Sequence, residues 1–468
     1  MMNTTSAIAL QALGRLWDDA GLPAEALDFV QLGGQDPVLP SSFAVGAAAQ
    51  ASLAAAALAA AEWRHARGAG PRQSVSVDMQ HAALECACHF TVDGVVLAAW
   101  DKVAGLYRCG DGGWVRLHTN FAHHRDGALA LLGCPTGPAT ERTLVAQALQ
   151  RWRAEDFETA AAEAGLVATA ARDFGAWDRH PHALAMVGTP LVRIERIGDA
   201  PPLQPPPAGP AAPPLQGLRL LDLTRILAGP VAARTLAAYG ADVLMLSSPN
   251  LPHIEAVAET SRGKRSAHVD LRTAHGCDTL RHLVRDAHVF LQGYRPGGLA
   301  ALGFAPEDLA ALRPGIVCVS LSAYGPVGPW AGRKGFDSLV QTATGFNVAE
   351  AEAFGSDEPK ALPMQILDYG AGYLLAFGAQ AALLRQLRDG GSWHVQVSLA
   401  GVGSWLRAMG RVDAGRQAAR PSYEPFLQTF DGGFGRVEAV RHAAGFSQTP
   451  AMWTRPSVPP GTDPARWS

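Results

Sequence analysis

The stretch LRLLDLTRILAGPVAARTLAAYGADVLML, residues 218–246, decides the fold. It holds an apolar run at 218–223, the loop TRILAGP, a helical segment that ends at Tyr239, and a second apolar run at 241–248. Two apolar runs joined by a helix within about thirty residues are typical of a strand-helix-strand unit, whose two strands lie parallel in one sheet. The stretch therefore predicts α/β structure.

The same alternation continues after this unit. Strands are predicted at 288–294, 316–324 and 394–399, with helices between them at 273–286 and 372–388. Near-continuous apolar strands that alternate with helices indicate a parallel sheet covered on both faces. We therefore expect a doubly wound, Rossmann-like large domain at 217–412.

A proline-rich stretch divides the chain. Residues 201–214 read PPLQPPPAGPAAPP, and polyproline geometry lets such a segment cross roughly 40 Å. We assign 199–216 as a linker that follows a smaller α+β domain at 91–198, and 413–468 as a closing segment.

Residues 1–90 are interpreted as a partial repeat of the large domain. The segment 41–84 matches 367–406 in order and type: a helix of small residues, an Arg/Gly turn, a Val-x-Val strand and another helix. Two copies of one unit suggest duplication or a permuted chain. The alanine-rich run 44–61 resembles a membrane span, but alanine is weakly apolar, which favours a close-packed soluble helix. No membrane partner is expected.

Composition narrows the function classes. The chain has 468 residues, 48% of them hydrophobic and 17% charged, with a formal net charge of -3. This is globular material without a basic stretch that would follow nucleic acid. The start lacks an export signal, so we expect a cytoplasmic protein. The six cysteines show no zinc spacing, and we expect reduced thiols and no metal site.

Cationic residues gather near the predicted strand ends. They are Arg225, Arg262, Lys264, Arg265, Arg272 and Arg295. Such a cluster suits a polyphosphate nucleotide such as coenzyme A (CoA), although a solvated charged surface has about equal weight for each residue alone. The sequence has no GxGxxG in this region, which disfavours a nicotinamide dehydrogenase.

Asp368 stands at the start of an apolar, glycine-punctuated helix, LDYGAGYLLAFGAQAALL. A carboxylate there is either a helix N-cap or a nucleophile held in a cleft of small residues, where glycines let a thioester approach. Local chemistry alone favours the cap. The two roles compete for the same first-turn amides.

Four further stretches, with the one that opens this section, resemble the class III CoA-transferase family. That family includes formyl-CoA transferase and carnitine CoA-transferase and is related to α-methylacyl-CoA racemase. The matching stretches are GKRSAHVDLR (263–272), VFLQGYRPGGLAALGF (289–304), IVCVSLSAYGPVGPW (316–330) and the Asp368 helix, in family order over 217–407.

The resemblance implies a CoA-transferase in which Asp368 attacks an acyl-CoA, forming a mixed anhydride and then an aspartyl-CoA thioester. CoA and acyl-CoA are then substrates, and no tightly bound cofactor is needed. The resemblance also implies a CoA site lined by Arg225, Ile226, Asp270, Leu271, Arg272, Gly293, Tyr294 and Arg295. The pattern of cations adds Lys264 and Arg265 to this predicted site. A homodimer, possibly interlocked, is expected by the same analogy.

Departures from the family pattern keep alternatives open. The racemase branch has a histidine where this chain has Phe336, which cannot exchange a proton. Ser247-Ser248 and Gly293-Tyr294 replace residues that usually contact CoA in the family. In the first repeat, Ser42 occupies the position that matches Asp368. The alternatives are a racemase-like or other acyl-CoA enzyme, or a CoA-binding homologue without turnover.

Three other groups of residues were weighed. The cluster His123, His124 and Asp126 is interpreted as structural or solvated, because it has no partner at metal spacing. Cys86 and Cys88 lack a third ligand. Asp337 is predicted with equal weight to be a second functional carboxylate or the cap of the helix that begins at Ser338.

Overall fold

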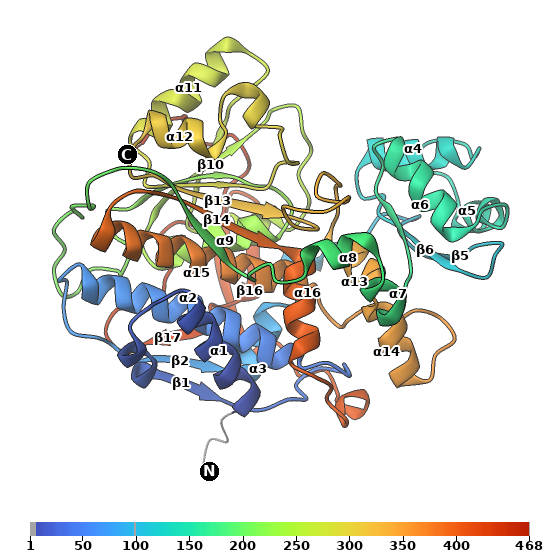
Figure 1. Ribbon diagram of the computed structural model, residues 1–468, viewed down its shortest axis with the longest axis horizontal. Helices are drawn as coiled ribbons and strands as arrows, with labels where there is room; N and C mark the ends of the chain where they lie inside the picture. The colour runs from blue at the N-terminus through green and yellow to red at the C-terminus, as the bar shows by residue number, and fades with distance from the viewer. Residues whose placement is uncertain (1–5, 98–99, 468) are drawn as a thin grey trace.

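A seven-stranded sheet forms the centre of the computed structural model, which describes residues 6–97 and 100–467 (Figure 1). The strands lie in the order β11, β10, β9, β12, β13, β14, β8. Their bounds are β8 Arg193–Gly198, β9 Arg219–Leu223, β10 Asp242–Ser247, β11 Arg265–His268, β12 Val289–Gln292, β13 Val317–Ser322 and β14 Ser392–Ser398. β9 to β14 are parallel, which confirms the predicted α/β fold with a parallel sheet.

Helices cover both faces of this sheet (Figure 1). On one face lie α11 (Ala274–Arg285) and α12 (Pro306–Leu312), and on the other lie α9 (Ala228–Ala238) and α15 (Ile366–Asp389). Leu221 of β9 packs into the core on the α11 and α12 face, and its neighbour Leu220 packs into the core on the α9 and α15 face. This alternation follows from the two-residue period of a strand. It leaves the carboxyl ends of the strands open to the loops that follow them.

The glycines of α15 serve packing. A Cβ built on Gly372 would lie 2.7 Å from the carbonyl oxygen of Ala228 in α9, and one on Gly378 would lie 2.6 Å from Val395 in β14. Any larger side chain would force these elements apart. The expectation that these glycines make room for a thioester is therefore wrong at both positions.

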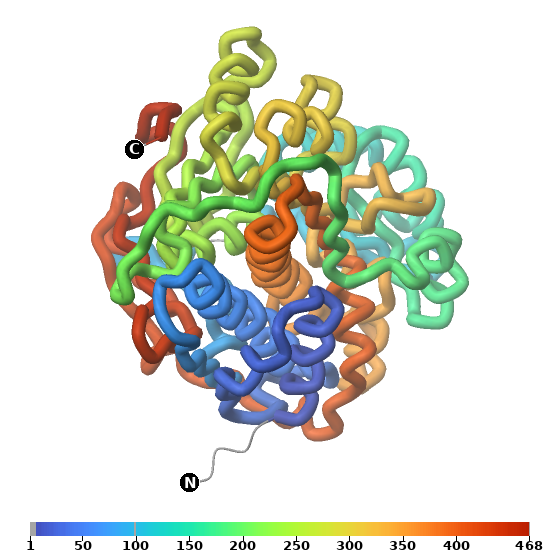
Figure 2. Tube along the Cα trace, turned by 60° about the vertical axis from the view of Figure 1, so that its left-hand side comes forward, coloured from blue at the N-terminus to red at the C-terminus, as the bar shows by residue number. Residues whose placement is uncertain are grey.

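The N-terminal residues form a second unit against α15. It contains α1 (Ala7–Asp19), η1 (Ala24–Phe29), β1 (Val30–Gly33), α2 (Val45–Ala66), β2 (Val75–Asp78) and α3 (Met79–Glu85), and its three-stranded sheet is completed by β17 (Ala444–Phe446). α2 lies along α15 in both views (Figures 1 and 2). By length and composition α2 is able to span a membrane, but its apolar window is entirely buried in the protein.

A smaller unit with its own core stands beside the large sheet. It comprises β5 (Gly105–Arg108), β6 (Trp114–Leu117), α4 (Ala122–Leu131), α5 (Arg142–Leu149), α6 (Ala154–Glu163) and β7 (Ala168–Ala170). Val115 and Leu117 point into this core, so the alternate residue Arg116 faces away from it. That outward face lies against the loops of the large unit.

The residues between 174 and 216 connect the small unit to β9. They include α7 (Phe174–Asp178), α8 (Pro181–Met186) and β8, followed by the proline-rich linker. β8 was predicted as part of the small domain, and this is wrong because β8 pairs antiparallel with β14 of the large sheet. An added edge strand satisfies backbone groups that β14 would otherwise leave open.

Both ends of the chain contribute to a fourth sheet. It has the order β15 (Leu427–Gly432), β16 (Gly435–Val440), β3 (Phe90–Val92), β4 (Val95–Val96). The remaining elements are α10 (Val257–Thr260), η2 (Ala300–Leu302), α13 (Asp337–Ala343), α14 (Phe346–Phe354), α16 (Leu399–Ala408), η3 (Gly415–Gln417) and η4 (Glu424–Phe426).

A buried ion cluster joins three of these units. Arg234 of α9 lies 2.9 Å from Glu85 of α3 and also pairs with Glu259 of α10. His442 of the closing segment lies 3.0 Å from Glu85. Because removing one member leaves an uncompensated buried charge, the cluster holds the units in one arrangement.

Candidate active site

Asp368 is the third residue of α15, and it does not cap that helix. Its backbone N–H donates to Asp337 Oδ2 at 2.9 Å, and Asp337 also accepts from the N–H of Leu367. Asp337 therefore binds the first-turn amides, which is the capping role that local chemistry had favoured for Asp368. Within residues 6–97 and 100–467, the Asp368 side chain accepts no hydrogen bond and is 9% exposed.

Two buried carboxyls lie together here, and each has a raised pKa. Burial raises the pKa of Asp368 well above its ordinary value, and the neighbouring charge of Asp337 raises it further. Burial also raises the pKa of Asp337, although its hydrogen bonds to α15 and to Gln341 oppose the shift. When Asp368 is ionised, its carboxylate has few solvating partners, which is the condition of an activated nucleophile.

A cationic cavity of about 400 Å³ opens on one side of Asp368. Its basic residues come from three loops of the large unit: Arg225, Arg295, Arg333 and Lys334. Asp368 is the acidic residue in its described lining, so the field favours an anionic ligand. Of the residues predicted from sequence, the cavity collects Arg225, Ile226, Gly293, Tyr294, Arg295 and Asp368.

The loop after β9 approaches Asp368 in a strained conformation. Ile226 has a φ of 75°, in the left-handed region that β-branched residues rarely adopt. Strain of this kind persists where surrounding contacts impose it, and it occurs often at functional sites. Next to it, Arg225 donates to the carbonyl of Pro252 and lies 5.6 Å from the ring of Phe121 in the small unit.

Two cations of this cavity were not predicted. Arg333 and Lys334 directly precede Gly335-Phe336-Asp337. Lys334 Nζ lies 3.1 Å from the carbonyl oxygen of Gly165, which ties the loop to the small unit. The sequence signal for these two cations was their position directly before the Gly335-Phe336-Asp337 motif.

Lys264 and Arg265 were predicted in the CoA site, and the structure contradicts both. Lys264 is fully buried, with Nζ 2.8 Å from Asp222 and 2.9 Å from the carbonyl oxygen of Pro230. Arg265 makes a bidentate pair with Asp242. A buried cation requires such partners, so neither side chain is free for a phosphate.

Asp270, Leu271 and Arg272 follow β11 and lie outside the cationic cavity. Arg272 Nη2 lies 2.8 Å from Asp270 Oδ2, and this hydrogen bond lowers the pKa of Asp270 to about 2. The Arg272 side chain is 69% exposed. Their contact with a nucleotide stays a prediction.

The histidines His123 and His124, interpreted from sequence as structural, both line the cationic cavity. Burial lowers the pKa of His124 to about 4, and the neighbouring cations lower it further. At neutral pH these imidazoles are therefore uncharged hydrogen-bonding groups.

A second cavity, of about 670 Å³, lies on the other side of Asp368. The two cavities share Ile226, Leu227, Phe336 and Asp368 as a common wall. The second cavity is also lined by Arg116, which lies in β6, and by His118, which directly follows β6. Phe336 stacks on His118 with a centroid distance of 3.9 Å.

Sequence reasoning missed Arg116 and His118. The pattern Trp-Val-Arg-Leu-His at 114–118 alternates apolar and polar residues, which indicates a strand with one polar face. Both side chains are nevertheless buried, at 8% and 6% exposed. That burial depends on the large unit packing over them.

The comparison with known families identifies one match. Residues 215–425 match the family described as CoA-transferase family III. A succinate–glutarate CoA-transferase of Agrobacterium fabrum is 33% identical over 249 residues, covering 47% of this chain and 62% of that protein. An acyl-CoA transferase of Gibberella moniliformis is 28% identical over 414 residues, covering 80% and 72%.

A further relative has a known structure. A probable fatty acyl-CoA transferase of Mycobacterium tuberculosis is 34% identical over 216 residues, covering 43% of this chain and 54% of that protein. Its orthorhombic crystal structure superposes with a TM-score of 0.38 over 42% of this chain and 56% of that one. The chain thus spans between about half and two thirds of the length of the Agrobacterium and mycobacterial relatives.

Proposed function

We propose, from the match of residues 215–425 to the model of CoA-transferase family III, that the chain moves CoA between an acyl-CoA and a carboxylic acid through a covalent intermediate on Asp368. The observation that carries the proposal is the position of Asp368. Its side chain, unbound within the described residues, stands where a cationic cavity and a second cavity meet. A thioester carbonyl is able to reach this carboxylate from one side and an acid from the other.

The reaction balances without a further reactant. A carboxylate oxygen of Asp368 attacks the thioester carbonyl, CoA thiolate leaves, and a mixed anhydride of Asp368 and the acyl group forms. The thiolate then attacks the Asp368 carbonyl, which releases the first acid and leaves an aspartyl-CoA thioester. The acceptor carboxylate attacks that thioester and expels CoA thiolate, which gives a second mixed anhydride. The thiolate finally attacks the acceptor's carbonyl in this anhydride, giving the new acyl-CoA and free Asp368.

Different residues bind the phosphates of CoA and position Asp368. The cations of the first cavity suit the phosphates of CoA, with Arg225 and Arg295 at the ends of β9 and β12. Asp337 keeps the first-turn amides of α15 occupied and holds Asp368 at the junction. Names of relatives such as succinate–glutarate and formyl-CoA:oxalate CoA-transferase support carboxylic acids as partners. Cytoplasmic location and a homodimer remain part of the proposal.

Trapping with hydroxylamine tests the covalent step. The protein is incubated with acyl-CoA substrates and then with hydroxylamine, which converts an acyl or thioester derivative of Asp368 to a hydroxamate. We expect the modified peptide to contain residue 368 and to depend on acyl-CoA. Absence of any adduct while CoA binds would require a non-catalytic CoA-binding protein instead.

A racemase-like reaction is distinguished by proton exchange. It requires two acid/base groups on opposite sides of the substrate's α-carbon, and Phe336 stands where the racemase branch carries its histidine. In deuterium oxide, a transferase leaves the α-hydrogen of the acyl group in place. Incorporation of deuterium at that carbon would favour the racemase instead.

A further inference from the structure

Arg116 is a buried cation that lies 5.3 Å from the ring centroid of Trp100 and has no carboxylate partner among the residues that the structure describes. It is 8% exposed, its Nε has no hydrogen-bond partner, and within residues 6–97 and 100–467 no carboxylate pairs with it and no group accepts a hydrogen bond from its side chain. Its side chain lines the second cavity. Burial lowers the pKa of Arg116 to about 10, so the guanidinium stays charged at neutral pH.

Three other deeply buried arginines pair with carboxylates, and a fourth, Arg64, donates to the carbonyl oxygens of Pro71 and Pro210. Arg234 pairs with Glu85, Arg262 with Glu259, and Arg172 with Glu158. Taking a charge out of water is costly unless a counter-ion and hydrogen bonds compensate for it. Arg116 therefore has the properties of a residue whose partner is a ligand anion.

Two acidic residues that line the cavity with Arg116 are already bound elsewhere. Asp101 accepts hydrogen bonds from Thr119 and from the N–H of Val103. Asp337 is close enough to favour the charged form of Arg116, but its oxygens accept from α15 and Gln341. The guanidinium keeps its donors for another acceptor.

The cavity between Arg116 and Asp368 has an apolar wall. It includes Ile254, Leu362 and Met364, together with the ring of Phe336. Its volume of about 670 Å³ exceeds what a single carboxyl group needs and falls in the range of small-molecule sites. A ligand that fits has an apolar middle and an anionic far end.

We propose that the second cavity binds the acyl part of a dicarboxylic acid, with one carboxyl reacting at Asp368 and the other bound by Arg116. The planar guanidinium matches a carboxylate with two parallel hydrogen bonds. This inference rests on the proposed function for the reacting end. The anionic end is argued from Arg116 and the cavity alone.

Matched acids test the inference. Succinate, glutarate and adipate are compared as CoA acceptors with butyrate, pentanoate and hexanoate, which lack the second carboxylate. We expect kcat/KM for the preferred dicarboxylate to exceed that of its monocarboxylate on the order of 10- to 100-fold, because a site built for a charged group rejects an analogue without it. Arg116→Met should remove that advantage, mainly through KM, and leave the monocarboxylate within about twofold.

Two controls separate this role from a structural one. Arg108→Met changes an exposed arginine on the neighbouring strand β5 and should leave both acids unaffected. Arg116→Met should keep or raise the melting temperature, because it removes an uncompensated buried charge. Equal loss with both acids would show that Arg116 binds the reacting carboxyl, and the dicarboxylate inference would be wrong.

Equilibrium binding keeps the two proposals distinguishable. Calorimetry of the same acids with the CoA-bound protein needs no turnover. Tighter binding of a dicarboxylate that Arg116→Met abolishes supports the inference even if no Asp368 adduct forms. Equal binding of both acids to the unaltered protein and to Arg116→Met overturns it, even if hydroxylamine traps Asp368.

Discussion

Helices α2 and α15 lie side by side in the core, and each has its N-terminus bound by an aspartate side chain. Asp36 accepts from the N–H groups of Gly46 and Ala47, the second and third residues of α2, at 3.1 and 2.8 Å. Asp337 does the same for the second and third residues of α15. Both helices are thus capped by a carboxylate from an earlier segment, which is the loop after β1 for α2 and the first turn of α13 for α15.

The likeness continues after the helices. α2 leads to β2 and α3, whose N-cap is Asp78, and α15 leads to β14 and α16, whose N-cap is Ser398. The residue at the place of Asp368 in α2 is Ala47, because each is third in its helix. The predicted match of Asp368 to Ser42 is therefore shifted, since Ser42 precedes α2 and its N–H donates to Glu350.

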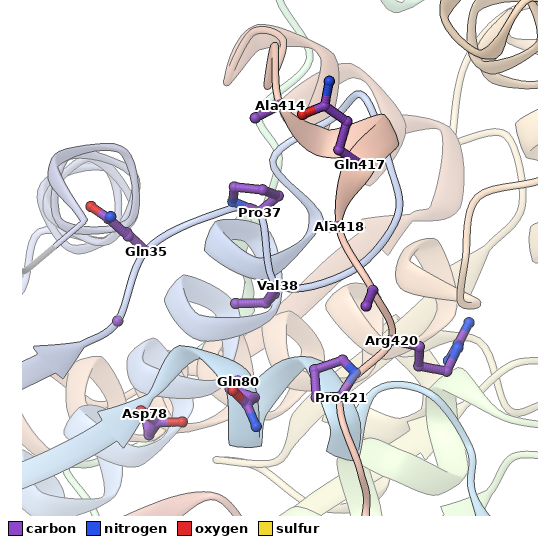
Figure 3. A pocket seen from close by; sticks show the side chains of 12 residues that line it. Gln35, Pro37, Val38, Asp78, Gln80, Ala414, Gln417, Ala418, Arg420 and Pro421 are labelled. Atoms are coloured by element: carbon purple, nitrogen blue, oxygen red, sulfur yellow. The ribbon is translucent and has the colours of Figure 1, made fainter.

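The spaces beside the two helices differ in chemistry. Near α2, a hollow of about 590 Å³ lies at the carboxyl ends of β1 and β2, and its polar lining includes Gln35, Asp78, Gln80 and Arg420 (Figure 3). The first turn of α2 has no acidic residue. The two helices therefore share a capped scaffold, and in the proposed function the second carboxylate in the first turn of α15 is the reactive group.

The largest expected effect comes from removing that carboxylate. Asp368→Asn should lower the rate of CoA transfer by at least about 10⁴-fold, because the nucleophile is lost, while CoA binding measured by calorimetry stays within a few fold. Asp36→Asn, at the cap of α2, should leave the rate per folded molecule within about twofold. Substantial transfer by Asp368→Asn would show that another residue forms the intermediate.

Removing the cap of α2 tests its structural role. Asp36→Ala leaves two first-turn amides without their acceptor, and we expect a loss of about 1–2 kcal/mol in the free energy of unfolding. Chemical denaturation measures this, and kcat should not change. Unchanged stability would mean that the Asp36 carboxylate contributes no net capping energy, as its burial-raised pKa opposes the charged form.

The smallest effect concerns pH. Burial raises the pKa of Asp368 and charge repulsion from Asp337 raises it further, so Asp337→Asn should move the acid limb of the kcat/KM profile to lower pH. The sign follows because Asp368 then ionises at lower pH. Asp36→Asn should leave the limb where it is. A shift to higher pH with Asp337→Asn would contradict the repulsion.

Much of the site's composition follows from local sequence. Arg225, Gly293 and Arg295 come directly after predicted strands, and the carboxyl ends of parallel strands meet at one edge of a sheet. The structure accordingly places all three in one cavity with Asp368. Lys264 and Arg265 were misplaced by the same reasoning, because they precede or begin β11 instead of following it.

By itself, then, the sequence determined most of the large sheet, with β11 as the strand that it missed, and the place of Asp368 near the start of α15. Both depend on apolar period and on neighbours within a few residues. The tertiary structure alone decided that Asp337 caps α15 and that Arg116 of a distant strand lines the same cavity as Asp368. Burial and pairing of such residues depend on how separate units pack together. An apolar pattern indicates that one face of an element is covered, but it does not indicate which other element covers that face.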